Sequence, residues 1–562
     1  MADEESAKED AKDPVAERRA ELLQQHDDKL EHARRHKSEW ELDMREAYFL
    51  AAPHRARAIN SRTAVTTKPL DAGEANTSFA CEMVTDFATA IVNTFTPEAN
   101  PWAMREPGLS VPDNVKDLLA EKIKAEDAKI FKGIGASNFY AECATAFIPD
   151  LGVGTVAMWI DDPHPYAGIE CQAIPMHELE ISVGPTGHLD YRAFVQHPFY
   201  RDLKALLPGI KTFPKEIDDK IKDKPRETVE VHRAFWRDWT VTTDVAWVYV
   251  TVVDRKHIVK DAKLRGAGSC PMIVARFNPM KEWAFGNGPT IQALPDFRHL
   301  DELAAAKIEN CDLNLRPPVT IPDDSVVNFE EGIEAGKAYP IRTGSEDAVK
   351  NIYQATSPDV AIYDRNDVEQ RIKRLHFLDF PDQLGKTPPS ATQWLDQMTM
   401  AQRRLGTVGA AFWREWCAEV FTRFEYLLAK RGYVTKITHN GKAVSLQPVN
   451  PSRKAADQQE VAQAARVIQI GGEAFHEEWK MTVDGGATIK NLIKKGGADG
   501  VIVMRSQADI ASATDMMAKL AGGQTPGAPQ AAANADQATV APPAPMGPPP
   551  AAPSRLDIRG HM

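Results

Sequence analysis

The sequence predicts a helix-rich α+β fold, and three of its features support this prediction. Apolar residues recur at the three- and four-residue spacing of helices early in the chain and again from Gly288 onward. Between these regions lie short runs rich in β-branched and aromatic residues, separated by Gly, Pro and Asp. The length of 562 residues, of which 43% are hydrophobic, is enough for several folding units with cores of their own.

The first part of the chain, residues 13–288, is expected to combine helices with a β region. Residues 1–12 are charged and polar and are expected to be disordered. Asp13 and Pro14 then begin a heavily charged helix that runs to about Leu50 and buries only a narrow stripe. Three further helices are expected at residues 77–95, 112–133 and 137–149.

The β region follows these helices and is predicted to be mainly antiparallel. Six runs are expected to be strands, at residues 153–160, 168–174, 179–183, 189–196, 228–239 and 245–253. A lysine-rich helix near residues 214–223 is expected as an insertion between two of these strands.

From Gly288 onward two helices enclose a small insertion. Residues 289–316 carry an apolar stripe at helical spacing, which predicts a rod of roughly 30 Å that ends at two prolines. Short strands and turns are expected in residues 317–356, a small α/β insertion. A second helix is expected at residues 357–377.

A loop with three prolines, residues 378–390, precedes the longest expected helix. Ser390 opens a capping box, and the helix can extend to Arg431, which is about 60 Å if it is straight. Gly406 and Gly409 are the expected bend. The remaining segments are a hairpin around Asn440-Gly441 that completes residues 391–448, a mostly helical segment at 449–520, and a disordered Pro/Ala-rich tail at 521–562.

Composition excludes several classes of protein. The net charge of −12 argues against a protein that coats nucleic acid through a basic surface, but it allows one that encloses DNA without gripping it. The six cysteines are far apart and are expected to be buried thiols in a reducing compartment. No run of about 18 apolar residues predicts a membrane helix, and the acidic N-terminus does not resemble a signal peptide. A soluble, intracellular protein is expected.

Two matches to nucleotide-binding motifs fail on their context. Residues 385–387 (GKT) have the tail of a P-loop, but Phe380 stands where that loop needs a glycine, and a charged helix precedes it. Gly152 and Gly154 resemble a dinucleotide fingerprint, but they lie between a helix and a strand, which is the reverse of the required order. These glycines are expected to let the chain turn into the sheet.

Other candidates for chemistry are equally weak. His32 and His36 stand four residues apart on an expected exposed helix, where a solvated pair is the simpler interpretation. Paired aspartates such as Asp161 and Asp162 would need a third converging acid for two-metal chemistry. The sequence therefore predicts no catalytic residue, no metal site and no cofactor, and we expect that the protein is not an enzyme.

Four blocks of sequence stand in a particular order within residues 35–520. They are residues 95–102 (FTPEANPW), 137–159 (SNF to GVGTVAMW), 286–300 (GNGP, QALPD and L) and 390–432 (SATQ, RRLG and RG). In this order they resemble the portal, or head-to-tail connector, proteins of short-tailed, podovirus-type bacteriophages. The chain departs from the family pattern at Asn287, Ser390 and Gln393, where Arg, Thr and Glu are usual.

The resemblance implies a portal architecture and a dodecameric ring around a channel for double-stranded DNA. The parts it implies are a wing (13–288), paired stem helices (289–316 and 357–377), a clip (317–356), a channel loop (378–390), a long kinked wing helix with a hairpin (391–448) and a helical crown (449–520). Such a ring sits at one capsid vertex of the virion, after assembly in the host cytoplasm. The implied partners are the terminase large subunit, capsid and scaffolding proteins, and the tail adaptor or tail tube proteins, with terminase and tail docking at the clip.

The resemblance also suggests residues for the two working parts of such a ring. Candidates in the channel loop that could face DNA are Phe380, Gln383, Leu384 and Lys386, although the two apolar ones could instead pack on the helix ends. Candidates for contacts between neighbouring clips are Val319, Ile321, Val326, Val327 and Ile341.

Two other classes of protein remain as alternatives. A DNA-processing enzyme such as a terminase or nuclease would show a P-loop or a converging acid cluster, and the sequence contains neither in a suitable context. A coat or tail-fibre protein would be mostly β, against which the long expected helices argue.

Overall fold

The computed structural model describes the protein over most of its first 435 residues and in short stretches beyond. The described residues are 14–53, 75–105, 113–163, 168–210, 212–315, 319–320, 350–351, 359–378, 408–435, 437–439, 442–443, 446–447, 460–461, 463–469, 483 and 485–496. The chain divides into two compact units, residues 1–482 and 483–562. Its mixture of helices and strands confirms the predicted α+β class.

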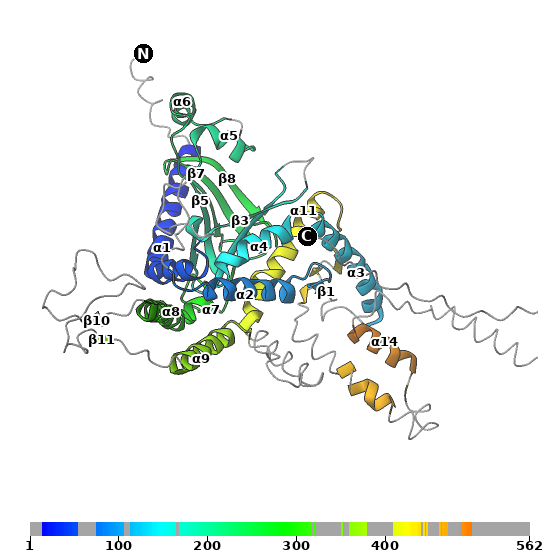
Figure 1. The fold of residues 1–562 in the computed structure, drawn as a ribbon. Helices are drawn as coiled ribbons and strands as arrows, with labels where there is room; N and C mark the ends of the chain where they lie inside the picture. Colours follow the sequence, from blue (N-terminus) through cyan, green and yellow to red (C-terminus); the bar gives the residue numbers. More distant parts are fainter. Residues whose placement is uncertain are drawn as a thin grey trace, which may run out of the picture. The chain divides into compact units, whose positions relative to one another are not determined.

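Most of the described helices form at positions that the sequence predicts, and the short α5 is an addition (Figure 1). In the first unit they are α1 (Pro14–Ala51), α2 (Phe79–Phe95), α3 (Asp113–Gly135), α4 (Phe139–Asp150), α5 (Leu203–Leu206), α6 (Lys215–Asp223), α7 (Pro289–Gln292), α8 (Leu294–Leu315), α9 (Asp359–Leu375) and α11 (Cys417–Lys430). Two 3₁₀ turns cover Met176–Glu178 and Tyr200–Asp202. The second unit contains α14 (Gly485–Gly496). None of the described helices is long and apolar enough to cross a membrane.

Two antiparallel sheets form the β region, as predicted. The larger has five strands that neighbour one another in chain order: β4 (Leu179–Val183), β5 (Leu189–Gln196), β6 (Val231–Arg237), β7 (Ala246–Val253) and β8 (His257–Arg265). The smaller has the order β3 (Glu170–Ile174), β2 (Thr155–Asp161) and β9 (Met272–Arg276). Three two-stranded pairs complete the list: β1 (Met104–Arg105) with β14 (Leu446–Gln447), β10 (Val319–Thr320) with β11 (Lys350–Asn351), and β12 (Thr438–His439) with β13 (Lys442–Ala443).

Strands β8 and β9 were not among the predicted strands. β8 is an edge strand, and its sequence HIVKDAKLR places Lys and Asp between the apolar residues because much of it faces solvent. β9 has only five residues, all of them buried. The predicted hairpin around Asn440-Gly441 is confirmed by the pairing of Thr438 with Ala443.

The five-stranded sheet is covered on both faces. On one face α1 packs through Leu30 and Ala33 against a cluster that includes Trp236 and Val250, and Figure 1 shows this helix beside the sheet. On the other face Trp159 of β2 contacts the ring of Phe235. The two sheets and α1 therefore share the apolar interior of the first unit.

Within the described residues, the helical stretch before α11 is separated from α11 at Trp416, and not at Gly409. Residues 408–415 are helical, Trp416 is a turn residue with φ −98° and ψ −72° whose amide still donates to Phe412 O, and α11 follows directly. Gly409 lies within the first of these helical stretches, where a Cβ atom would come within 2.3 Å of Phe95 Cζ. Close packing on Phe95 therefore explains this glycine, while Gly406 lies outside the described residues.

Arginine–carboxylate pairs connect the region around α11 to both sheets. Arg276 of β9 is buried and pairs with Glu415 at 2.7 Å, and its side chain also donates to the backbone carbonyls of Trp283 and Gly187. Arg192 of β5 pairs with Glu419 at 2.8 Å. These contacts join segments that are far apart in the chain.

The predicted burial of the cysteines is confirmed for four positions, and Cys81 is half-buried. Cys143, Cys171, Cys270 and Cys417 are buried. Cys311 on α8 is exposed, so the prediction is wrong there.

Candidate functional site

The most distinctive feature of the first unit is the pair of neighbouring helices α8 and α9 (Figure 1). The helix expected at 289–316 is divided at Ala293 into the short α7 and the longer α8. The helix expected at 357–377 is α9, at Asp359–Leu375. Each helix is held firmly at the end nearest the sheets.

A contact between two glycine-rich segments fixes the start of α7. The amide of Gly288 donates to Val153 O, and the amide of Thr290 donates to Gly152 O, both at 3.0 Å. A Cβ atom at Gly288 would lie 2.1 Å from Gly152 O, so glycine is required for this approach. Gly154 has φ +120°, which confirms that its glycine lets the chain turn into the sheet.

His376 fixes the end of α9 to the same place. Its Nε2 lies 3.3 Å from the Thr290 hydroxyl, and its Nδ1 lies 2.9 Å from Ile372 O. The rings of Phe87 and Phe297 flank the imidazole. Burial lowers the pKa of His376 to about 4, so the ring is neutral at pH 7.

Phe377 ends α9 in a left-handed backbone conformation. Its φ of +58° is uncommon for a bulky residue, and the Leu378 amide closes the cap by donating to Lys373 O at 2.8 Å. The Phe377 ring lies edge-on to Phe277, with 6.1 Å between the centroids. The packing of Phe377 therefore offsets a conformation that glycine would adopt at less cost.

Farther from the sheets, α8 presents apolar side chains to solvent. Leu294, Phe297 and Leu300 are buried at its start. Ile308 is 52% exposed and Leu315 is 79% exposed. We call the outward row of Ile308, Cys311 and Leu315 the α8 stripe; these residues recur at i, i+3 and i+7 and so share one face.

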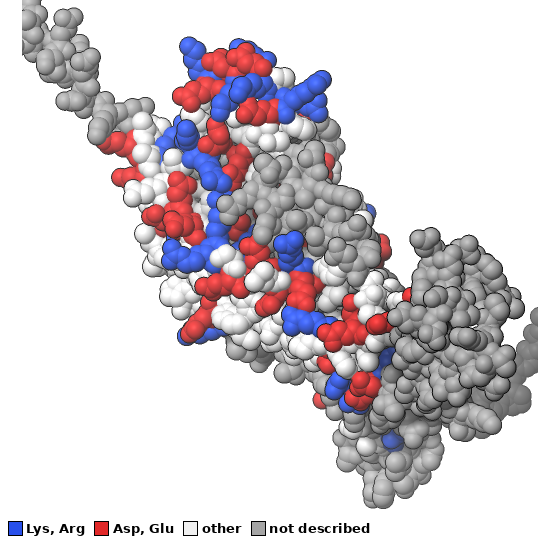
Figure 2. All heavy atoms as spheres, turned by 60° about the vertical axis from the view of Figure 1, so that its left-hand side comes forward, with Lys and Arg blue, Asp and Glu red and all other residues white. Residues whose placement is uncertain are grey.

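Ion pairs surround α8 and α9. His299 Nε2 lies 2.9 Å from an Asp364 oxygen, and Arg371 pairs with Asp296 at 3.5 Å. Arg298 pairs with Glu46, which connects α8 to α1. Figure 2 shows acidic and basic groups interspersed over the described surface in that view, without one dominant basic patch.

Most of the residues predicted for the clip and the channel loop lie outside the described residues. Val319 lies in β10, where it is paired with Asn351 of β11, so the two ends of the 317–356 insertion are held together. The other predicted clip residues, Ile321, Val326, Val327 and Ile341, lie outside the described residues, as do Phe380, Gln383, Leu384 and Lys386.

Sequence reasoning missed the junction between Thr290 and His376. The sequence shows one pair of glycines at 152 and 154 and another at 286 and 288. The presence of two such glycine-rich segments was the available signal for a close backbone contact between them. No three or more His, Cys, Asp or Glu side chains among the described residues form a group that could hold a metal ion.

Comparison with known proteins identifies a family. The family model for the bacteriophage head to tail connecting protein matches residues 23–502. No curated protein matches the chain.

Many solved chains also resemble this chain, and two of them come from gene transfer agent particles. One is a chain from the neck of an empty GTA particle computed with C6 symmetry; it has 12% identity and a TM-score of 0.34, and the match covers 74% of this chain and 90% of that one. The other is a chain from the virion of a native gene transfer agent particle, with 14% identity, a TM-score of 0.32, and coverage of 73% and 98%. TM-scores this low do not establish a shared fold.

Proposed function

Because the chain belongs to the family of bacteriophage head to tail connecting proteins, we propose that it is a portal protein. In this proposal about twelve copies form a ring at one vertex of the capsid. Double-stranded DNA enters the head through the channel of the ring during packaging and leaves through it during ejection.

The α8 stripe is the observation on which the proposed ring rests. Full burial of one Ile or Leu side chain stabilises an assembly by roughly 1.5–3 kcal/mol. A row of such side chains on a helix that is anchored at one end is suited to contact a neighbouring copy. Mixed charges around the helix pair can set the register between copies.

The charge of the chain suits a channel through which DNA must slide. Phosphate contacts supply essentially all of the affinity of non-specific DNA binding, so a strongly basic wall would slow the DNA. A net charge of −12 for each chain is compatible with weak contact. The family and the charge together favour a passive conduit over a DNA-processing enzyme, and we expect no ATP hydrolysis by the ring itself.

The proposed partners follow from the position of such a ring. The insertion at 317–356, whose ends pair through β10 and β11, would dock the terminase large subunit and later the tail adaptor or tail tube proteins. Capsid and scaffolding proteins would contact the ring during assembly in the host cytoplasm.

The test is the assembly state of purified protein with a changed α8 stripe. Native mass measurement and projection images of the unaltered protein should show rings of about twelve chains of 62.1 kDa each. Ile308→Asp would place a carboxylate in an apolar contact and should reduce ring formation at least tenfold. The matched control, Ile308→Val, keeps the side chain apolar and should form rings.

A monomer at micromolar concentration would contradict the proposed ring. Normal rings from Ile308→Asp would remove the α8 stripe from the subunit contact. ATP turnover by the purified ring would favour the enzyme alternative.

A further inference from the structure

The face of α1 that lies on the five-stranded sheet contains two buried ionisable residues among those described. Leu30 and Ala33 supply apolar contacts there. His26 and Lys37 are buried on the same side, with 0% and 6% of their surface exposed. Charged groups are rarely buried without a specific partner, so these two positions depart from the usual pattern for a packed helix.

His26 faces a second buried histidine across the interface. Its ring centroid lies 5.1 Å from that of His232 on β6 and 6.3 Å from that of Tyr191 on β5. Its Nδ1 lies 3.0 Å from an oxygen of Asp27. No hydrogen-bond partner for its Nε2 is present among the described residues. With Nδ1–H donating to Asp27, a second proton would sit on Nε2 and would have no acceptor on the sheet side.

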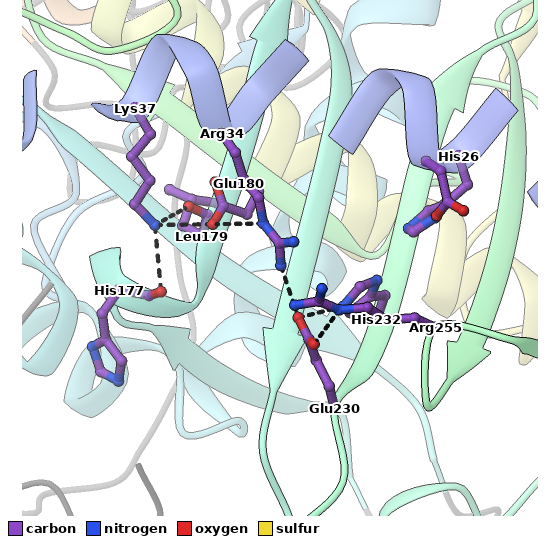
Figure 3. A network of polar contacts seen from close by, with 10 residues as sticks. His26, Arg34, Lys37, His177, Leu179, Glu180, Glu230, His232 and Arg255 are labelled. Carbon is purple, nitrogen blue, oxygen red and sulfur yellow. Dashed lines mark hydrogen bonds and ion pairs between the residues drawn. The ribbon is translucent and has the colours of Figure 1, made fainter. Parts of the chain in front are cut away.

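Charged groups from α1, from the start of β6 and from the turn before β8 surround the two histidines (Figure 3). His232 Nε2 lies 2.9 Å from Glu230, and Arg34 of α1 donates to the same carboxylate at 2.7 Å. Arg255, in the turn before β8, pairs with Glu230 as well. His197, after β5, is a further titratable group near Glu230 and His232.

Lys37 holds the next part of α1 by contacts that acid does not remove. Its ammonium donates to Leu179 O at 2.8 Å, to His177 O at 3.3 Å and to Glu180 at 3.4 Å (Figure 3). Beyond it, Met44 and Ala47 are fully buried in the apolar interior. The helix is thus anchored by Lys37 and these residues. His26 lies in the part before Lys37, which also contacts the sheet region through Leu30 and Ala33 and through the pairs of Arg18 and Arg19 with Asp261.

We propose that residues 14–33 of α1 form a pH-sensitive clasp, which leaves the sheet when His26 takes up a proton. The clasp goes beyond the portal function and does not depend on it. In the closed state His26 is neutral and packs against His232; in the open state water solvates the imidazolium ion.

The sign of the pH effect follows from proton linkage. Burial, and next the neighbouring His232, lowers the pKa of His26 from 6.5 to about 4 in the closed state. The open state therefore binds more protons between these values, and the closed state loses stability as pH falls from 6.5 toward 4. This difference in the pKa of His26 between the two states raises the ratio of open to closed clasp about 30-fold when the pH falls from 7.5 to 5.

Glu230 adds to the effect in stronger acid. Burial acts to raise its pKa, but the nearby His232 ring and the Arg255 guanidinium outweigh burial and hold the pKa well below its usual range. A carboxylate of this kind stabilises the closed state above its unfolded pKa, and that stability is lost as pH falls below it. Among the described partners of Glu230 only Arg34 belongs to α1, so acid favours opening through Glu230 only by weakening that one ion pair.

Hydrogen exchange of the full chain, measured by mass spectrometry at pH 7.5 and pH 5, tests the clasp. After correction for the intrinsic exchange rate, peptides from residues 18–33 should exchange about 30-fold faster at pH 5, and peptides from β7 should keep their protection. His26→Leu should reduce the acid effect on α1 to less than threefold. His32→Leu, which changes an exposed histidine of the same helix, should keep the full effect.

A second variant keeps the test decisive if leucine disturbs folding. His26→Gln retains polarity without a proton that titrates in this range, and it should also remove the acid effect. The proposal is overturned if unaltered α1 exchanges equally at both pH values, or if the acid effect persists in a folded His26 variant.

Discussion

Asp150 is a buried carboxyl group at the end of α4, and the hydroxyl of Tyr48 donates a hydrogen bond to it. Burial raises the pKa of Asp150 from 3.8 to about 7. The folded protein therefore holds this proton more tightly than the unfolded chain does. Stability from this group is present at low pH and is lost as pH rises from 3.8 through 7.

We predict that this residue makes the protein less stable in mild alkali. Between pH 6 and pH 8 the contribution of Asp150 to the free energy of unfolding should fall by about 1.4 kcal/mol. Asp150→Asn keeps an acceptor for Tyr48 but cannot ionise, so that loss should disappear. Urea unfolding at pH 6 and at pH 8 measures this change in the free energy of unfolding.

An exposed carboxyl group provides the control for Asp150. Asp86→Asn on α2 should leave the difference between pH 6 and pH 8 as it is in the unaltered protein. An equal loss of stability in Asp150→Asn would show that another group is responsible.

Single residues also show where sequence reasoning reaches its limit. The turn at Gly154 could be predicted, because two glycines stand at the start of a strand. The close contact of Gly409 with Phe95 could not, because 314 positions separate them in the chain and only the fold brings them together. The same is true of His376 and Thr290.

At the level of elements, helix and strand periods predicted most of the first unit. β4 and β5 have the predicted bounds, because turn residues flank each apolar run. β8 was missed because an edge strand can carry charge on its exposed face, which removes the apolar run that marks a strand. The pairing of β2 with both β3 and β9 depends on contacts that periodicity does not encode.

The attachment of α11 to the sheets provides a prediction about elements. Arg276 and Glu415 are both buried, so removal of the cation alone leaves an uncompensated carboxylate. Arg276→Met should lower the free energy of unfolding by about 3–5 kcal/mol. The double variant with Glu415→Leu should recover at least half of that loss. Urea unfolding followed by tryptophan fluorescence measures both.

The exposed pair between Arg298 and Glu46 is the matched control for this ion pair. Arg298→Met should cost less than about 1 kcal/mol, because solvent screens exposed charges. If Arg276→Met cost no more than Arg298→Met, the buried pair would not secure α11.

For the whole molecule, the order of sequence blocks was more informative than any single motif. The resemblance predicted the family, and the family model that matches residues 23–502 confirms it. The α8 stripe could be foreseen as an apolar row, but its exposure could not, because the same spacing also describes a helix buried in its own chain. The clip and channel loop remain predictions.

The last prediction concerns Lys386 and belongs to the assembled particle. Residues 378–390 contain one cation, Lys386, against Asp379 and Asp382. If this loop lines the channel, one lysine from each of about twelve copies would form a weak collar of phosphate contacts, whose strength falls with salt. Lys386→Glu should then make packaged DNA leak severalfold faster from infectious particles, while Lys386→Arg should retain it. Genome length and leakage should be scored separately from ring formation. Unchanged packaging and retention would remove Lys386 from the channel, and failed ring formation would instead place this loop between subunits.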